Sequence, residues 1–419
     1  MNDRSDYEPL TPESLPGRLG TVSEIAEQVG GPPSEWRVRE IGDGNLNLVF
    51  IAEGRLGKVC VKQALPYVRL VGDSWPLPLY RAFYEHHALV RQAARAPGSV
   101  PELLHYDDAQ AIIAMEFVEP HIILRHKLIN GEKVDGLAQF LGRYCAQTAF
   151  RGSSLSLSSA EKKADVALFA GNVAIPAITE ALVFTDPYYD AEMNRHTKGL
   201  DKVVAGLRSD VDLKVKVQQM LHRFTSNTET MVHGDLHSGS IMSTDSDSRV
   251  IDPEFAQYSP MGFDLGMLIA NFLMAYFSQP AHRGADLAEY QEWILGVIAD
   301  TGASFETEFR VLWSTERTGV LFPEALFERQ GQDSAPACAV VLKEIWHDAW
   351  AICGIEMHRR CLSLAHNADF ENIADEALRA RLEARNLMMG TELIHKSEDI
   401  SGPDAVCDMA RAFNEGELA

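Results

Sequence analysis

The chain has 419 residues, of which 46% are hydrophobic and 23% are charged, and this ordinary globular composition is interrupted by no repeated or low-complexity segment. Its 60 acidic and 38 basic residues give a formal net charge of −22. Such a charge repels phosphate backbones and anionic membrane surfaces, so we expect neither nucleic acid nor membrane as a partner. The length exceeds what one hydrophobic core usually serves, which predicts two lobes.

The six cysteines lie far apart and form no Cys-x-x-Cys pair. A chain of this size does not need disulfide staples, so we expect reduced thiols and a cytoplasmic protein. Residues 1–16 are polar and acidic, and the longest apolar run, residues 267–277, is interrupted by Asn271 and is too short to span a bilayer. The sequence therefore predicts a soluble chain that is not exported.

The first part of the chain alternates short β-branched runs with two helical segments. Strands are expected from residue 36 to residue 61, where a turn separates antiparallel runs, and again at residues 111–115. Helices are expected over residues 21–29 and 79–94, where apolar residues recur at helical spacing. We place the lobe boundary after Val118, where the last apolar run has ended.

Beyond that boundary, helical spacing dominates the chain. Helices are expected over residues 137–150, 198–207, 213–225, 262–277, 287–299 and 337–364. The sequence therefore predicts an α+β fold with two lobes. A small antiparallel-sheet lobe occupies residues 1–118, and a larger, mainly helical lobe occupies residues 119–419.

A glycine-rich turn lies between two strand-like flanks at residues 41–50, which read IGDGNLNLVF. Gly44 and Asn45 permit the tight backbone that can approach a phosphate group. An ordinary β-hairpin is the alternative, because asparagine and glycine are standard turn residues. The turn alone does not separate these two interpretations, and only motifs further along the chain can do so.

Lys62 ends the run at residues 59–61, 17 positions after Asn45. A lysine on a rigid strand reaches the α- and β-phosphates of a nucleotide, and two strands with a turn supply this spacing. A solvated charge at a sheet edge is the alternative. Glu85 on the following helix is expected to pair with Lys62, with a plain surface glutamate as the other interpretation.

Residues 231–240 read MVHGDLHSGS, between a predicted helix and a predicted strand. Asp235 in this loop is the candidate catalytic carboxylate, because it would accept a hydrogen bond from an attacking hydroxyl and orient it toward a γ-phosphate. The alternative is a turn with a capping aspartate. His233 and His237 are four residues apart, but no third ligand lies at metal spacing after them, so we interpret both as structural.

Asp252 and Glu254 come 17 and 19 positions after Asp235, at the end of a buried-type strand. On an extended segment residues i and i+2 point the same way, so both carboxylates can bind Mg²⁺ and bridge it to phosphates. Solvated acids in a turn are the alternative. The chain has no Gly-x-x-x-x-Gly-Lys-Ser/Thr and no Gly-x-Gly-x-x-Gly strand–helix unit, which excludes P-loop and Rossmann nucleotide sites.

These motifs together resemble the aminoglycoside phosphotransferase and choline kinase superfamily, whose members have a protein-kinase-like fold. The resemblance spans most of the chain, and the longer strings GDGNLNLVF, HGDLHSGS and DPEF resemble the methylthioribose kinase family in particular. The resemblance implies that ATP, with Mg²⁺, donates its γ-phosphoryl group to the anomeric hydroxyl of 5-methylthioribose. It also implies a homodimer and a role in methionine salvage.

The resemblance further implies site residues outside these motifs. On the nucleotide side, backbone groups of a hinge would hold adenine and Pro253 would join the metal-binding acids; the hinge residues are Glu116, Phe117 and Val118. On the substrate side, the resemblance implies a tryptophan-containing loop with Trp75 and an arginine pair formed by Arg359 and Arg360. Solvated or ion-paired arginines on a helix are the alternative.

One position departs from the wider superfamily. Many members have an asparagine five residues after the catalytic aspartate as a metal ligand, and here that residue is Ser240. A hydroxyl is a poorer ligand, so we expect Asp252 and Glu254 to carry the metal. Asp264 also matches a recurring superfamily position and is interpreted as structural.

Two other functions stay open at this stage. One keeps the fold but changes the acceptor to a cationic alcohol such as an aminoglycoside or choline, which a net charge of −22 would attract. The other is an ATP-binding protein without catalysis. All three depend on one spatial expectation, namely that Lys62, Asp235, Asp252 and Glu254 converge around a metal-bound nucleotide.

Overall fold

The computed structural model describes residues 6–41, 46–68 and 72–416, and the chain divides into two compact units. The first unit comprises Met1–Pro120 together with Arg249–Phe255, and the second comprises His121–Ser248 and Ala256–Ala419. The predicted α+β organisation, with a small antiparallel sheet in one unit and mainly helices in the other, is confirmed. The sequence analysis placed Arg249–Phe255 in the second lobe, although it expected Asp252 and Glu254 to lie near Lys62; in the structure this segment groups with the first unit.

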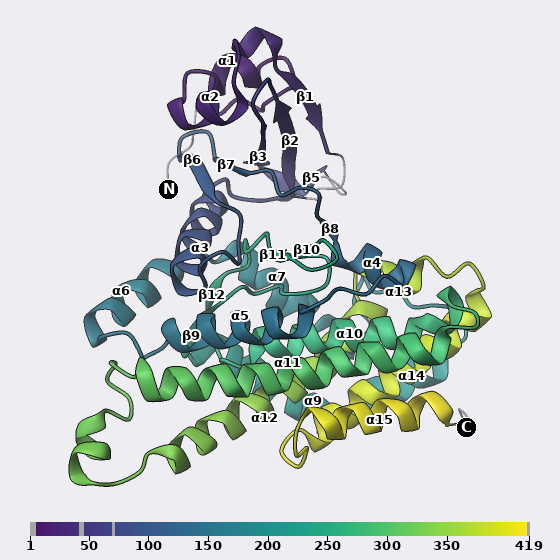
Figure 1. Ribbon diagram of the computed structural model, residues 1–419. Helices are drawn as coiled ribbons and strands as arrows, with labels where there is room; N and C mark the ends of the chain where they lie inside the picture. The colour runs from purple at the N-terminus through teal and green to yellow at the C-terminus, as the bar shows by residue number, and fades with distance from the viewer. Residues whose placement is uncertain (1–5, 42–45, 69–71, 417–419) are drawn as a thin grey trace. The chain divides into compact units, whose positions relative to one another are not determined.

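A five-stranded antiparallel sheet forms the centre of the first unit (Figure 1). Its strand order is β1-β2-β3-β7-β6, and the strands are β1 Arg37–Glu40, β2 Asn47–Glu53, β3 Lys58–Ala64, β7 Ile112–Glu116 and β6 Leu103–Asp107. Lys62 on the central strand β3 lies opposite Val49 on β2 and Ile113 on β7. A central position fixes the backbone of Lys62 from both sides, unlike the edge position of the alternative interpretation.

The two faces of this sheet pack against different parts of the first unit. Val59 and Val61 belong to a hydrophobic core that also includes buried residues of the N-terminal helices α1 (Leu15–Leu19) and α2 (Ser23–Val29). Because side chains alternate along a strand, Lys62 points to the opposite face. Helix α3 (Arg81–Arg95) packs against β3, β6 and β7 and presents its buried Glu85 to Lys62.

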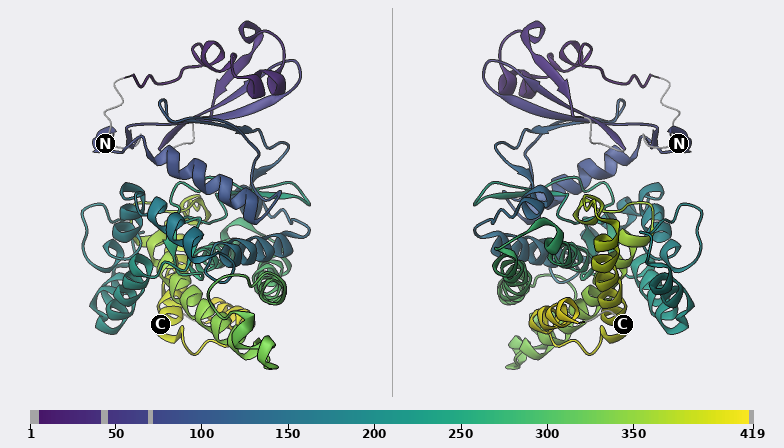
Figure 2. Two further views of the ribbon diagram at one scale, coloured as in Figure 1. Left: turned by 90° about the vertical axis from the view of Figure 1, so that its left-hand side faces the viewer. Right: turned by 90° about the vertical axis from the view of Figure 1, so that its right-hand side faces the viewer.

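The second unit is built mainly from helices. They are α4 Leu124–Asn130, α5 Leu137–Arg151, α6 Ser159–Phe169, α7 Ala174–Leu182, α8 Asp201–Ser209, α9 Val211–Ser226, α10 Phe263–His282, α11 Leu287–Thr315, α12 Ala335–Leu362, α13 Ala368–Glu371, α14 Glu376–Lys396 and α15 Pro403–Glu415. Helix α5 packs along α11 (Figure 1), and α12 packs against both α10 and α14. Figure 2 shows the same ribbon from two further sides. The short elements that remain are β4 Tyr67–Val68, β5 Gly72–Pro76, β8 Ile122–Ile123, β9 Thr230–Val232, β10 Ile241–Ser243, β11 Ser248–Val250 and β12 Gln257–Ser259, with 3₁₀ turns at Pro33–Glu35, Asp186–Tyr188, Glu324–Leu326 and Glu328–Gln330.

Helix α11 continues well past its predicted end at residue 299. Gly302 lies just beyond that predicted end, and glycine disfavours a helix interior. In the structure, a Cβ atom at Gly302 would collide with the ring of Pro403, which begins α15. Gly302 therefore serves a close approach between two helices rather than a helix end. Some of the observed helices were not predicted, namely α1, α4, α6, α7, α13, α14 and α15.

Among the long helices, α10 is the most apolar, and it lies in the protein core. Within the described residues no single helix is long and apolar enough to span a bilayer. One pair of helices, Ser159–Phe169 and Ala174–Tyr188, has sufficient length and hydropathy only when the two are taken together, and they are bent by 78° relative to each other. Helix α10 is buried along most of its length, which explains its apolar composition. All six cysteines are unpaired, and five of them are buried.

Candidate functional site

Lys62 lies at the centre of a charged group in the first unit. Its ammonium is 2.8 Å from Oε1 of Glu85 and forms a second ion pair with Oδ1 of Asp252. Only 8% of Lys62 is exposed, and Glu85 is 3% exposed. A solvated edge lysine and a solvated surface glutamate are therefore excluded as descriptions of these two residues.

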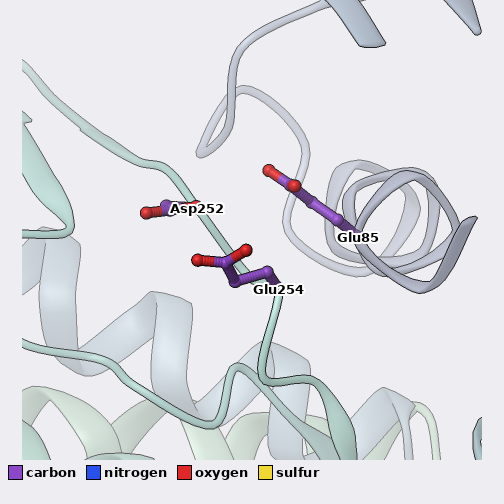
Figure 3. A group of neighbouring side chains, drawn as sticks. All are labelled: Glu85, Asp252 and Glu254. Atoms are coloured by element: carbon purple, nitrogen blue, oxygen red, sulfur yellow. The ribbon is translucent and has the colours of Figure 1, made fainter. Parts of the chain in front are cut away.

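Three carboxylates converge beside this lysine (Figure 3). Among the described residues, Glu85, Asp252 and Glu254 form the one group of acids suited to a metal ion, with one oxygen from each within 4.8 Å of the others. Glu85 reaches the group from α3, whereas Asp252 and Glu254 come from the segment Arg249–Phe255. Hard carboxylate oxygens at this spacing fit Mg²⁺, which prefers oxygen ligands.

The backbone at Asp252 is strained in a way that fits a functional position. Its φ of 69° lies in the left-handed region, which is unfavourable for a residue with a Cβ atom. Such conformations persist where surrounding structure enforces them, and they concentrate at functional sites. Pro253, the next residue, is buried, whereas 46% of the Asp252 side chain is exposed. The carboxylate of Asp252 is thus accessible to a ligand.

Burial and charge act against each other in this group. Burial alone would lower the pKa of Lys62, but Asp252 and Glu85 outweigh it and the net pKa is raised, so Lys62 is charged. Burial raises the pKa of Glu85 to about 7, with Lys62 opposing the shift. Burial also raises the pKa of Glu254. Three acids share two nearby cations here, so a further cation would relieve their mutual repulsion.

Two residues that hold Glu254 in place were missed by the sequence analysis. The Asn47 side-chain amide donates a hydrogen bond of 3.1 Å to Oε2 of Glu254, and Nε of Arg81 lies 3.8 Å from the same oxygen. Arg81 in turn donates to Oδ1 of Asn47 at 3.0 Å and to the carbonyl of Leu65 at 2.6 Å. Arg81 is almost fully buried at the start of α3. The sequence offered one indication for Asn47, namely that it is a polar residue within the glycine-rich motif at residues 41–50.

The predicted hinge residues lie at the end of a sheet strand. Glu116 is the last residue of β7, and its backbone N–H donates to the carbonyl of Glu102 at 2.8 Å. The ring of Phe117 lies 5.6 Å from the ammonium of Lys58, and Val118 is buried. Phe117 and Val118 lie beyond the strand, so a role for their backbone groups in holding adenine stays a prediction.

Three of the predicted site residues receive little or no description. Gly44 and Asn45 lie outside the described residues. Trp75 lies in the short strand β5, which pairs with β4, but its side chain is also outside what is described. Their roles stay predictions from the sequence.

In the second unit, Asp235 lies in a loop whose backbone is hydrogen-bonded by the side chains of Asp264 and Ser240. The carboxylate of Asp264 accepts hydrogen bonds from the backbone N–H groups of His233 (2.6 Å) and Gly234 (3.0 Å). Gly234 has a φ of 87°, which favours glycine at this turn. The hydroxyl of Ser240 contacts the carbonyl oxygens of Asp235 (2.9 Å) and His237 (3.0 Å). Asp264 and Ser240 thus shape the loop that carries Asp235.

The predicted arginine pair contacts Asp235 directly. Nη1 of Arg359 lies 3.4 Å from Oδ1 of Asp235, and Nη2 of Arg360 lies 3.1 Å from the same oxygen. Both arginines also contact Glu356 one turn earlier on α12, with Nε of Arg360 at 2.5 Å and Nη1 of Arg359 at 3.2 Å from Oε1. Each arginine is 6% exposed and Glu356 is fully buried. A solvated arginine pair is therefore excluded, but the two arginines are ion-paired, so their contact with substrate stays a prediction. Glu356 is a further residue that the sequence analysis missed.

These cations keep Asp235 ionised. Burial alone would raise the pKa of Asp235, but His237, Arg360 and Arg359 together lower it well below its ordinary value. Burial lowers the pKa of His237 to about 4, so the histidine is neutral at pH 7. The arginines therefore supply the charge, and His237 contributes through the position of its ring, with Nε2 at 3.3 Å from Oδ2 of Asp235. A carboxylate held in this state orients a hydroxyl better than it removes a proton beforehand.

Comparisons with known proteins identify the family of this chain. The model of the family described as "Phosphotransferase enzyme family" matches residues 37–297. The chain is 41% identical to a methylthioribose kinase of Escherichia coli over 97% of this chain and 98% of that protein. It is 39% identical to methylthioribose kinase 1 of Oryza sativa subsp. japonica, over 91% of this chain and 90% of that protein.

Among solved structures, a glucosamine kinase in complex with glucosamine, ADP and inorganic phosphate aligns with 91% of this chain and 86% of its own, at 13% identity and a TM-score of 0.47. The methylthioribose kinases have a much higher sequence identity to this chain, and the matches span nearly the whole length of both proteins. The chain therefore belongs to the phosphotransferase enzyme family and, within it, to the methylthioribose kinases.

Proposed function

We propose that this chain transfers the γ-phosphoryl group of ATP to the anomeric 1-hydroxyl of 5-methylthioribose, giving 5-methylthioribose 1-phosphate and ADP in methionine salvage. The relatives at about 40% identity carry the name methylthioribose kinase, which supports this acceptor. The structural observation that carries the proposal is the carboxylate of Asp235, which is partly exposed and is contacted by both Arg359 and Arg360. We further propose a homodimer, which rests on the family resemblance, and a cytoplasmic location, which rests on the cysteine pattern of the sequence.

The nucleotide side of the reaction belongs to the first unit. Lys62, oriented by Glu85, would contact the α- and β-phosphates, while backbone groups at Glu116, Phe117 and Val118 would hold adenine. Asp252 and Glu254 are the residues that would hold Mg²⁺. The ion, when bound, supplies positive charge next to the phosphate oxygens and so lowers the energy of the charged transition state.

The acceptor side belongs to the second unit. Asp235 would accept a hydrogen bond from the 1-hydroxyl and keep its oxygen aligned with the γ-phosphorus atom. A bond forms between that oxygen and phosphorus, the bond from phosphorus to the β–γ bridging oxygen breaks, and ADP leaves with the bridging oxygen. The hydroxyl proton passes to Asp235 as the new bond forms, and Arg359 and Arg360 stabilise the charge on the phosphoryl oxygens.

The surroundings of Asp235 also favour a neutral acceptor. A cationic alcohol such as an aminoglycoside or choline would have to approach Arg359 and Arg360, which touch the carboxylate that must receive it. Like charges at such a distance repel strongly in a poorly solvated site. The net charge of −22 attracts cations to the whole molecule, but these two local cations oppose them at the acceptor position.

The test is ADP release with Mg²⁺ and a panel of acceptors comprising methylthioribose, ribose, choline, homoserine and kanamycin. Selective turnover of methylthioribose is expected. Asp235→Asn serves as the inactive control, and Arg411→Ala serves as the matched active control because its ion pair with Glu292 is solvent-exposed. A much higher kcat/KM with another acceptor would contradict the sugar assignment, and no ADP release with any acceptor would support a protein that only binds ATP.

A further inference from the structure

The two carboxylate oxygens of Asp235 have different neighbours. Oδ1 contacts both guanidinium groups, Arg359 at 3.4 Å and Arg360 at 3.1 Å. Oδ2 lies 3.3 Å from Nε2 of His237, which is two residues along the same loop. A carboxylate oxygen offers about two acceptor positions. The arginines occupy those of Oδ1, whereas His237 occupies one position on Oδ2.

The loop backbone decides which nitrogen of His237 carries a proton. The backbone N–H of Gly239 donates a hydrogen bond of 2.9 Å to Nδ1 of His237. A nitrogen that accepts a hydrogen bond has no proton of its own, so the neutral ring carries its proton on Nε2. That N–H is the group facing Asp235. The ring is therefore a donor to Oδ2 and cannot serve there as a base.

The absence of a side chain at Gly239 leaves the space that the His237 ring occupies. A Cβ atom built on Gly239 would lie 2.7 Å from Cε1 and 2.9 Å from Nδ1 of the His237 ring, and 3.1 Å from Nη1 of Arg125. The first two distances are shorter than real Cβ contacts, so any side chain at residue 239 would displace the ring. The glycine, the ring and Asp235 thus form one connected unit.

We infer that His237 is a positioning residue for Asp235: its Nε2–H fixes Oδ2 so that the acceptor position left on this oxygen receives the sugar hydroxyl. The inference deepens the proposed function and rests on it. It goes beyond the sequence interpretation of His237 as merely structural, because it assigns a defined proton and a defined partner. It also predicts that Oδ2, and not the arginine-bound Oδ1, takes the hydroxyl proton.

Two substitutions separate this role from simple support of the loop. His237→Gln keeps an N–H donor at about the reach of Nε2, whereas His237→Asn keeps an acceptor near Gly239 but is too short to reach Asp235. We expect His237→Asn to lower kcat at least tenfold with little change in KM for methylthioribose, since the missing contact acts on the reacting oxygen. His237→Gln should keep kcat within about threefold of the original chain.

The reverse pattern, an active His237→Asn and an impaired His237→Gln, would assign His237 to loop support and overturn the inference. Equal kinetics in both variants would overturn it as well. Gly239→Ala gives a second route if the His237 variants fail to fold, because it should displace the ring and reproduce the loss of kcat. Its melting temperature and circular dichroism should stay close to those of the original chain, and unchanged kcat in the folded variant would contradict the inference.

A spectroscopic measurement tests the inference even if methylthioribose is not the acceptor. In the chain labelled with ¹⁵N-histidine, the His237 ring, assigned by its absence in His237→Gln, should show a protonated Nε2 and an unprotonated Nδ1 at pH 7. The charged groups that face this ring are Asp235, Arg360 on α12 and Arg125 on α4. A proton on Nδ1 would overturn the inference, whereas a wild-type chain without turnover of methylthioribose contradicts the proposed function alone.

Discussion

The two units carry charged groups of opposite design. In the first unit a buried cation, Lys62, is paired with acids, and three carboxylates share Lys62 and Arg81. In the second unit a partly exposed acid, Asp235, is paired with buried cations, and the two arginines are matched by Asp235 and Glu356. The first group has an excess of acid and is suited to an additional cation. The second is balanced, which suits a neutral acceptor such as a sugar.

Removing the central acid of the second unit should have the largest effect. Asp235→Asn leaves Arg359 and Arg360 without one of their two carboxylates and removes the acceptor for the hydroxyl proton. We expect kcat/KM for methylthioribose to fall about 10³-fold. ADP release measured at saturating ATP checks this. A variant that keeps more than a tenth of the original activity would contradict the catalytic assignment.

Removing the central cation of the first unit should have the next largest effect. Lys62→Met keeps the length of the side chain but leaves Glu85 and Asp252 without their shared ammonium. We expect kcat/KM for ATP to fall about 10²-fold, since a contact to the phosphates is lost. Initial rates over a range of ATP concentrations check this. An effect confined to KM for the sugar would place Lys62 outside the nucleotide site.

Removing one arginine should have a smaller effect, because the other still contacts Oδ1 of Asp235. Arg359→Ala or Arg360→Ala is expected to lower turnover at least about tenfold, through lost stabilisation of the phosphoryl charge. Single-turnover rates check this, with Arg411→Ala as a matched control on α15. Unchanged kinetics in both variants would refute the assignment of the pair to the substrate.

The sequence predicted features that depend on short stretches of chain. The strand before Lys62, the helix with Glu85 and the i, i+2 spacing of Asp252 and Glu254 each arise from local periodicity, and the structure shows them. The fold class was predictable in the same way, because a sheet-rich part precedes a helical part. Family resemblance supplied Arg359 and Arg360, which local patterns alone would assign to a solvated helix face.

Apart from the meeting of Lys62 with Asp252 and Glu254, which the motifs predicted, contacts between distant parts of the chain were not predictable. Asn47 and Glu254 are hydrogen-bonded across 207 positions of sequence, and Glu356 reads as an ordinary helical glutamate until α12 is seen to be buried. The return of Arg249–Phe255 to the first unit is a tertiary event that no periodicity encodes. Helix α11 continues past its predicted end through Gly302, where the close approach of Pro403, about a hundred residues later, leaves no room for a side chain.

The smallest predicted effect concerns a buried acid of the second unit that lies outside the Asp235 group. Glu383 on α14 is fully buried, and burial raises its pKa from 4.5 to about 7, with Thr197 and Arg379 opposing the shift. The folded chain therefore binds more protons than the unfolded chain between these two values. Its contribution to stability falls as pH rises through this window, by up to about 1.4 kcal/mol per pH unit.

Glu383→Gln removes this titration, whereas Asp235, held ionised by arginines, should titrate only at much lower pH. We therefore expect the melting temperature of Glu383→Gln to fall less between pH 5 and pH 8 than that of the original chain, with kcat unchanged at pH 7. Differential scanning calorimetry at both pH values checks this. Parallel falls in the two proteins would mean that Glu383 is ionised throughout, and the contrast between an acid held by cations and an acid neutralised by burial would then fail.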